Sequence, residues 1–158
     1  MSTDAQKLGD WGELQVAKHV PCQVCHSKGL TALANSFPSL DLVCRECGAY
    51  LAQVKTVSVS VSAPTKRPNV IRGAGWRPLQ AQIAIGSIRD LYLVGALPHG
   101  KAWQLAWIDR VPGQGLLANA HVFEHRIANI GGGKRLHPMF NIAYAKIPPA
   151  CVLSVYSG

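Results

Sequence analysis

The stretch from Cys22 to Lys55, CQVCHSKGLTALANSFPSLDLVCRECGAYLAQVK, contains the two patterns that decide the fold. The first is a pair of Cys-x-x-Cys motifs, Cys22 with Cys25 and Cys44 with Cys47. This spacing is typical of a structural zinc site, because each short turn brings two thiolates to the same side of one ion. A thioredoxin-like redox site would need only one such motif ahead of a helix. Four thiolates leave Zn²⁺ no open position, so we expect this ion to support folding rather than chemistry.

The second pattern is polar and surrounds the second cysteine pair. Asp41 precedes this pair by three residues, Gln53 and Lys55 follow it, and Glu13 lies on an expected first helix. Carboxylate and amide oxygens suit Mg²⁺, with Asp41 as principal ligand and Gln53 as auxiliary ligand. Lys55 lies two residues beyond Gln53 on a strand, so it shares the same face and can polarise a water molecule. The alternative is a set of exposed side chains at a sheet edge.

Length, composition and charge limit the class of protein. The 158 residues suit one domain, spanning 1–158, and 48% of them are apolar. A net charge of +8 favours a polyanionic partner, most often nucleic acid. No apolar stretch approaches the length of a membrane span, so we expect no membrane association and a cytoplasmic location.

Periodicity and turn residues predict an α/β fold, with a mixed central sheet flanked by helices and a zinc knuckle inserted at about residues 22–47. A first helix should start at the cap of residues 2–4 and end before Pro21. The segments 62–78 and 110–133 read as loops, the first of them basic. A second helix is expected at 79–88, and strands at 30–34, 40–43, 49–61, 91–97, 102–108, 140–144 and 152–156.

The combined motifs resemble the PD-(D/E)xK nuclease superfamily, and within it the DpnI-type family of methyl-directed restriction endonucleases. The catalytic domain of that family also has two Cys-x-x-Cys pairs, an Asp-x-x-Cys run and an acid-x-Lys motif. Here these are Asp41-Leu42-Val43-Cys44 and Gln53-Val54-Lys55. The likeness extends back through Gln6-Lys7 and Glu13, and forward to Asn141-Ile142 and Ile147-Pro148.

The resemblance implies a restriction-endonuclease-like core and a metal-dependent endonuclease that hydrolyses phosphodiester bonds of DNA with Mg²⁺ or Mn²⁺. In this reading Lys55 positions the water, Asp41 and Gln53 hold the metal, and Glu13 is a supporting acid. Two departures stand out. Gln53 replaces the family's acid, which removes a negative charge from the site. Second, we expect no counterpart of the family's winged-helix DNA-binding domain, so specificity should come from this domain or from a partner.

Candidate DNA contacts are four basic residues of the loop expected at 62–78, two basic residues that follow the glycines at 131–133, and one tryptophan that can insert into or stack on DNA. They are Lys66, Arg67, Arg72, Trp76, Arg77, Lys134 and Arg135. Solvated loop charge is the alternative for each cation, and a core position for Trp76. Cleavage of both strands makes a homodimer plausible, although no residue pattern indicates one.

Three other functions remain open. Gln53 can mark a disabled nuclease that only binds nucleic acid. A Holliday-junction-resolvase-like enzyme shares the same core. His121-Val122-Phe123-Glu124-His125 matches the H-x-x-E-H pattern of a zinc peptidase, which needs a helix to bring both histidines to one face. The glycines on either side of this segment make a catalytic helix doubtful.

Overall fold

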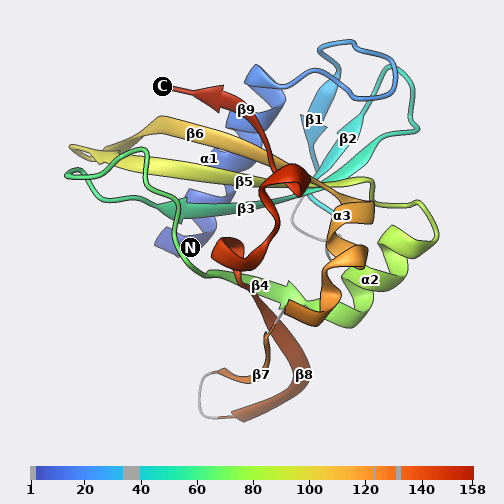
Figure 1. Ribbon diagram of the computed structural model, residues 1–158. Coiled ribbons are helices and arrows are strands. Elements are labelled where there is room, and N and C mark those ends of the chain that lie inside the picture. The colour runs from blue at the N-terminus through green and yellow to red at the C-terminus, as the bar shows by residue number, and fades with distance from the viewer. Residues whose placement is uncertain (1–2, 34–39, 123, 131–132) are drawn as a thin grey trace.

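A six-stranded mixed sheet, in the order β1-β2-β3-β5-β6-β9, forms the centre of the computed structural model (Figure 1). The structure describes residues 3–33, 40–122, 124–130 and 133–158, with side chains except those of 73–78 and 122–140. The strands of this sheet are β1 (Leu30–Ala32), β2 (Leu42–Cys44), β3 (Leu51–Ser58), β5 (Asp90–His99), β6 (Ala102–Pro112) and β9 (Leu153–Ser157). The predicted α/β class with a mixed central sheet is therefore confirmed.

Helix α1 (Asp4–His19) covers one face of the sheet. It begins where Thr3 accepts a hydrogen bond from Gln6 N and Gln6 Oε1 accepts one from Thr3 N, which is a capping box. Its buried residue Val16 joins a core with Leu42, Ala52 and Tyr92. Gly12 lies against β3, since a Cβ at this position would stand only 1.8 Å from Thr56 Oγ1. The missing side chain of Gly12 thus lets α1 approach the sheet closely.

The opposite face carries a second core, beneath α2 (Trp76–Ala84) and α3 (Gly113–Ala118). Alternation along β5 shows the two faces directly: Leu91 and Leu93 belong to this second core, whereas Tyr92 and Val94 belong to the first. Leu79 and Leu116 supply the helical side chains of the second core. The sheet is therefore buried on both faces.

The connection between β3 and β5 determines the sheet's mixed character. β1 pairs with β2, and β2 with β3, in the antiparallel direction. β3 and β5 are parallel, with Lys55 opposite Leu93. β5 and β6 form an antiparallel pair around a turn in which Gly100 has a φ of 60°. In that pair Gly95 faces Trp107, and a Cβ on Gly95 would lie within 2.4 Å of the indole ring.

A small second sheet, in the order β4-β8-β7, corrects the prediction for both expected loops. It contains β4 (Ile71–Gly75), β7 (Glu124–Ile130) and β8 (Gly133–Ile142). Segment 62–78 therefore includes a strand and the start of α2, and segment 110–133 includes the end of β6, α3, η1 (Ala120–Val122) and β7. β4 pairs with β8 across about 70 residues of sequence, with Ile71 opposite Ile142, and no local pattern encodes a partner so far away.

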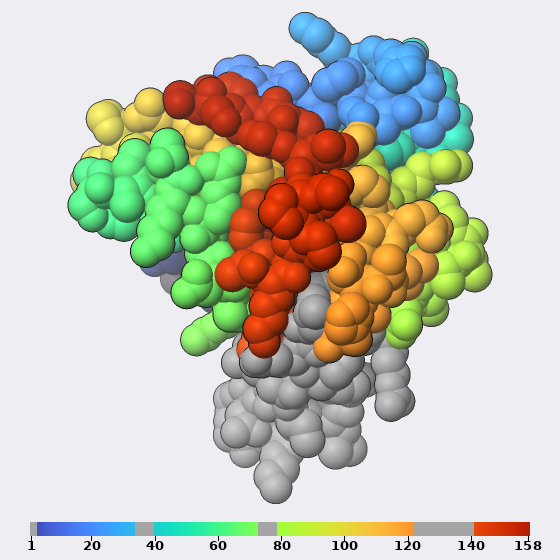
Figure 2. All heavy atoms as spheres, in the orientation of Figure 1, coloured from blue at the N-terminus to red at the C-terminus, as the bar shows by residue number. Residues whose placement is uncertain are grey.

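The C-terminal segment crosses the outside of the second core before it forms β9. It contains η2 (Tyr144–Lys146) and η3 (Pro149–Cys151). Figure 2 shows it between the segment that follows β3 and helix α3. In the part of the chain that the structure describes, no helix is long and apolar enough to cross a membrane.

Candidate functional site

The four cysteines of the two Cys-x-x-Cys motifs come together at one point, as their spacing predicts. Their Sγ atoms all lie within 4.8 Å of one another, with 3.7 Å between Cys22 and Cys47 and 3.6 Å between Cys25 and Cys44. A tetrahedral ion with Zn–S bonds of about 2.3 Å requires Sγ–Sγ separations of about 3.8 Å. The four residues therefore fit a structural zinc ion.

Two tight turns shape this cluster, which we call the zinc knuckle (residues 22–47). In the first turn His26 N donates to Cys22 O, and His26 takes a left-handed φ of 59°. In the second turn Gly48 N donates to Cys44 O, with a φ of 64° at Gly48. The main-chain N–H of Cys47 lowers the pKa of the Cys44 thiol to about 6, so the turn itself favours a thiolate.

The second site lies at the fork where β2 separates from β3. The two strands pair only through Leu42 opposite Ala52 and Val43 opposite Leu51. At Asp41, the residue before β2 begins, the main-chain N donates to Ala52 O at 3.1 Å, and Oδ2 accepts from Val54 N at 2.7 Å. The carboxylate of Asp41 thus takes the place of a neighbouring strand as the hydrogen-bond acceptor for the main-chain N–H of Val54. Burial raises the pKa of Asp41, while Lys55 and the Val54 N–H lower it.

Glu13 reaches the same fork from α1. Its pKa is raised to about 7, first by burial and then by the negative charges of Asp41 and Asp10, while Lys55 lowers it. Electrostatic coupling of this kind places Glu13, Asp41 and Lys55 within range of one another's charge. These three residues come from α1, from the position just before β2, and from β3.

Gln53 completes this group, but it is more deeply buried than expected. Its side chain is 1% exposed, and Oε1 has no hydrogen-bond partner among the described residues. Gln53 and Lys55 are two residues apart on β3, so their side chains leave the same face of the strand. An orphaned amide oxygen in the interior is costly unless a cation or water binds it. We call Glu13, Asp41, Gln53 and Lys55 the fork; the oxygens of its first three residues are of the type that could hold an oxygen-ligated metal.

The main-chain support of Asp41 is one part of this site that sequence reasoning missed. The Val54 N–H that holds the carboxylate becomes available only because β2 stops pairing at Leu42. A short strand next to an acidic residue is only a weak signal for such a separation of strands. The predicted strand at 40–43 included Asp41, whereas in the structure β2 begins one residue later, at Leu42.

The predicted DNA contacts have different surroundings. Lys66 and Arg72 are exposed. Trp76 and Arg77 begin α2, and Lys134 and Arg135 lie in β8, but their side chains are outside the described part.

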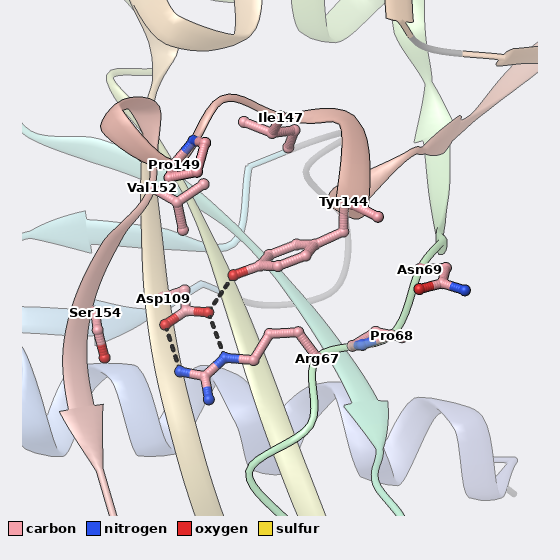
Figure 3. Close-up of a pocket in the computed structure, with 10 residues that line it drawn as sticks. Arg67, Pro68, Asn69, Asp109, Tyr144, Ile147, Pro149, Val152 and Ser154 are labelled. Atoms are coloured by element: carbon pink, nitrogen blue, oxygen red, sulfur yellow. Dashed lines mark hydrogen bonds and ion pairs between the residues drawn. The ribbon is translucent and has the colours of Figure 1, made fainter.

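Arg67 is engaged within the chain (Figure 3). It donates from Nε and Nη2 to the two oxygens of Asp109, at 2.8 and 2.9 Å, and stacks 4.6 Å from the centre of the Trp107 ring. The Tyr144 hydroxyl also donates to Asp109. Asp109 is 1% exposed, so this carboxylate needs its partners. The pair anchors the segment after β3, and Arg67 is no longer a good candidate for a phosphate contact.

The Arg67–Asp109 pair forms the floor of a cavity of about 440 Å³ (Figure 3). Pro68, Ile147, Pro149 and Val152 give it mainly apolar walls. Both oxygens of Asp109 are already occupied by Arg67 and Tyr144. This cavity therefore offers little unsatisfied polar chemistry.

The zinc-peptidase alternative lacks the helix that it needs. His121 lies in the three-residue η1, and Glu124 and His125 lie in β7, with Phe123 outside the described residues. Successive residues of a strand point to opposite faces, so the i, i+4 geometry of a helical metal motif is lost. The structure therefore does not support the zinc-peptidase alternative, in line with the doubt that the flanking glycines raise about a catalytic helix.

Comparison with known proteins adds no family to this geometry. No protein-family model matches the sequence, and no curated protein is significantly similar to it. The relation to PD-(D/E)xK nucleases therefore remains a proposal, based on the motifs and on the fork.

Proposed function

We propose that this protein is a metal-dependent DNA endonuclease of the PD-(D/E)xK type, with a restriction-like role. The observation that carries the proposal is the fork, where Glu13, Asp41 and Lys55 interact electrostatically beside the orphaned Oε1 of Gln53. An acid, a metal-binding amide and a lysine on one strand face form the donor set that phosphodiester hydrolysis needs. The sequence of α1, β1, β2, β3, α2 and a β5 parallel to β3 supports a restriction-endonuclease-like core.

Asp41 and Gln53 would hold the metal ion, Mg²⁺ or Mn²⁺. Oδ2 of Asp41 is fixed by Val54 N, while Oδ1 has no hydrogen-bond donor among the described residues, so one oxygen remains for a cation. Such an ion, when bound, neutralises charge on the phosphate and acidifies a water molecule. Glu13 adds a second acidic group from α1, and its ionised form becomes more favourable once a positive charge lies beside it.

Lys55 orients the nucleophile. The charge of Lys55 acts on two carboxyl groups, and the residue is partly exposed. Its Nζ can therefore donate a hydrogen bond to a water molecule and orient a lone pair of the water oxygen toward the phosphorus. Gln53 is uncharged, so the fork carries one negative charge fewer than an acid at that position would give. We expect weaker metal binding for that reason.

The DNA would approach the fork at Lys55, which is partly exposed. Lys55, Leu93 and Asp109 form one row across β3, β5 and β6, so Asp109 stands on the same face about 10 Å away. Arg67 binds Asp109 and thereby holds its neighbour Lys66 over this face. Exposed Lys66 and Arg72 can then neutralise phosphates without reading sequence.

Cleavage assays with single variants test the proposal. Purified protein is incubated with methylated, unmethylated and branched DNA, with Mg²⁺, with Mn²⁺, or without added metal. We expect metal-dependent cutting that falls at least about 100-fold in Lys55→Ala, because the water loses its orienting donor. DNA affinity should change less than about threefold in the same variant. Asp41→Ala should also abolish cutting, and branched DNA as the preferred substrate would indicate a resolvase-like role.

Lys101→Ala is the matched control for Lys55→Ala. Lys101 is exposed in the turn between β5 and β6, so this change removes the same charge without touching the fork. Cutting by Lys55→Ala at the rate of the control would remove Lys55 from the mechanism. Tight binding of every DNA without cutting by the unmodified protein would favour the binding module, a function that the uncharged Gln53 also permits.

A further inference from the structure

A second cavity, of about 430 Å³, opens between the zinc knuckle and the helices α2 and α3. In Figure 1 these parts lie at the same end of the sheet, where β3 and β5 begin. Half of its lining residues are polar or charged: Gln23, Tyr50, Arg89, Asp90, Arg110 and Gln114. The nuclease proposal gives none of these residues a role.

Arg110 has a donor that no described residue satisfies. Its Nη1 donates to Gln23 Oε1 and lies 3.8 Å from Asp90 Oδ2. Its Nε is buried and has no hydrogen-bond partner. Arginine stays protonated in proteins, so an unmet N–H on its guanidinium in the interior requires an acceptor.

The one carboxylate in the cavity is already engaged. Asp90 is 7% exposed, and Tyr50 donates its hydroxyl proton to Asp90 Oδ2 at 2.5 Å. The Tyr50 hydroxyl also lies 2.7 Å from that of Tyr92, so the three groups form a polar cluster beside Arg110. The negative charge of Asp90 therefore offsets the positive charge of one of the two arginines that line the cavity, Arg110.

Arg89 is the cation left over. It is exposed, and its Nε donates to Ala49 O at the edge of the zinc knuckle. Within the described residues no carboxylate lies at ion-pairing distance from it. The lining of the cavity thus carries one surplus positive charge, that of Arg89, beside the amide of Gln114 and beside Arg110, whose buried Nε has no partner among the described residues.

We propose that this cavity binds a phosphoryl group through Arg89 and Arg110. A guanidinium presents its N–H groups in a planar fork that matches the oxygens of a phosphate. The net charge of +8 raises the local concentration of such anions. Arg110 follows Tyr92 and Val54 in a row across the sheet, so this site is about 10 Å from the strand that supports Asp41. The inference does not depend on nuclease activity, because phosphate binding here requires no metal at the fork.

Calorimetric titration of the zinc-loaded protein without Mg²⁺ tests the proposal. The probes are inorganic phosphate and a trinucleotide with either a 5′-phosphate or a 5′-hydroxyl group. We expect saturable phosphate binding with a Kd of about 1 mM or tighter. Arg89→Gln should weaken it about tenfold, because a charge-assisted hydrogen bond is lost from an exposed position. A preference for the 5′-phosphorylated trinucleotide would identify a terminal phosphate as the ligand, and equal binding of both would identify an internal one.

Two further variants keep the test decisive. Lys101→Gln removes one positive charge at the opposite end of β5 and should leave phosphate binding unchanged. Arg110→Lys keeps the charge near Asp90 but removes Nε, so it should weaken phosphate binding while the protein stays folded. Absence of saturable binding, or equal weakening by Arg89→Gln and Lys101→Gln, overturns the proposal. If the unmodified protein binds phosphate at this cavity but cuts no DNA, that result contradicts the proposed nuclease function and leaves the phosphate site standing.

Discussion

At the scale of single residues, the surroundings of Glu13 in the fork favour the neutral form of its carboxyl group. Glu13 has a pKa of about 7, compared with 4.5 for an ordinary glutamate, because burial and the nearby Asp41 and Asp10 oppose its charge. A folded-state pKa above the unfolded value means that the stabilising effect of the neutral form is complete below pH 4.5 and is lost as pH rises through 7. The metal-free fork therefore destabilises the protein at alkaline pH.

Glu13→Gln should remove this pH dependence. The glutamine is uncharged at every pH, so without added Mg²⁺ the variant should match the unmodified protein near pH 5 and exceed its stability at pH 8 by about 1 kcal/mol, after allowance for solvent screening. Urea unfolding from about pH 5.5 to about pH 8.5 measures the difference. Glu46→Gln, at an exposed carboxylate, is the control. A constant difference across this range would contradict the electrostatic account of Glu13.

At the scale of elements, the position of Glu13 depends on how closely α1 approaches β3. Gly12 precedes it, and a Cβ there would lie 1.8 Å from Thr56 Oγ1 and 2.9 Å from Thr56 Cβ. Either the threonine or the helix must move to admit a side chain. Gly9, one turn earlier, has no atom within 4 Å of its virtual Cβ.

Gly12→Ala should therefore destabilise the protein by about 1–3 kcal/mol, in spite of the better helix propensity of alanine. Gly9→Ala should stabilise it by up to about 1 kcal/mol, because only propensity changes there. Thermal or urea unfolding compares the two variants. Adding Thr56→Ala to Gly12→Ala should recover most of the loss; a double variant no more stable than Gly12→Ala would argue against the contact with Thr56.

The sequence predicts those elements whose signals are local. The cap at Thr3, the helix that it starts and the long strand β3 follow from capping residues and β-branched patterning, and the structure has all three. β4 and β7 lie in segments predicted as loops, and only the end of β8 falls in the strand predicted at 140–144. Glycine, proline and arginine mark these segments as loops, whereas the pairing of β4 with β8 depends on residues far apart in the sequence. For the fork the sequence did not predict the burial of Gln53, since burial depends on tertiary packing around β3 that no local pattern encodes.

At the scale of the whole molecule, the zinc knuckle belongs to one of the two hydrophobic cores. Cys22 and Cys44 are fully buried and pack with Val16, Leu42 and Tyr50. Without an ion, four sulfur atoms within 4.8 Å of one another would have to share that space as thiols or repelling thiolates. If the cluster holds zinc, we expect metal binding and folding of this half of the protein to be coupled.

Removal of zinc should unfold the core that α1 covers. We expect one zinc ion per chain by metal analysis, and loss of cooperative unfolding in Cys44→Ser or after treatment with a strong chelator. Cys151→Ser changes a half-buried cysteine outside the cluster, so it should keep both the ion and the unfolding transition. Full zinc content in Cys44→Ser would show that the ion is held elsewhere.

The close contact between Gly95 and Trp107 limits how this protein can vary during evolution. The two residues face each other on β5 and β6, and the indole fills the space that a Cβ would need. A side chain at position 95 is compatible only with a smaller residue at position 107, and Arg67 would then lose the ring on which it stacks. Positions 67, 95 and 107 should therefore change together among descendants of this sequence, although residues 67 and 107 are separated by forty positions of chain.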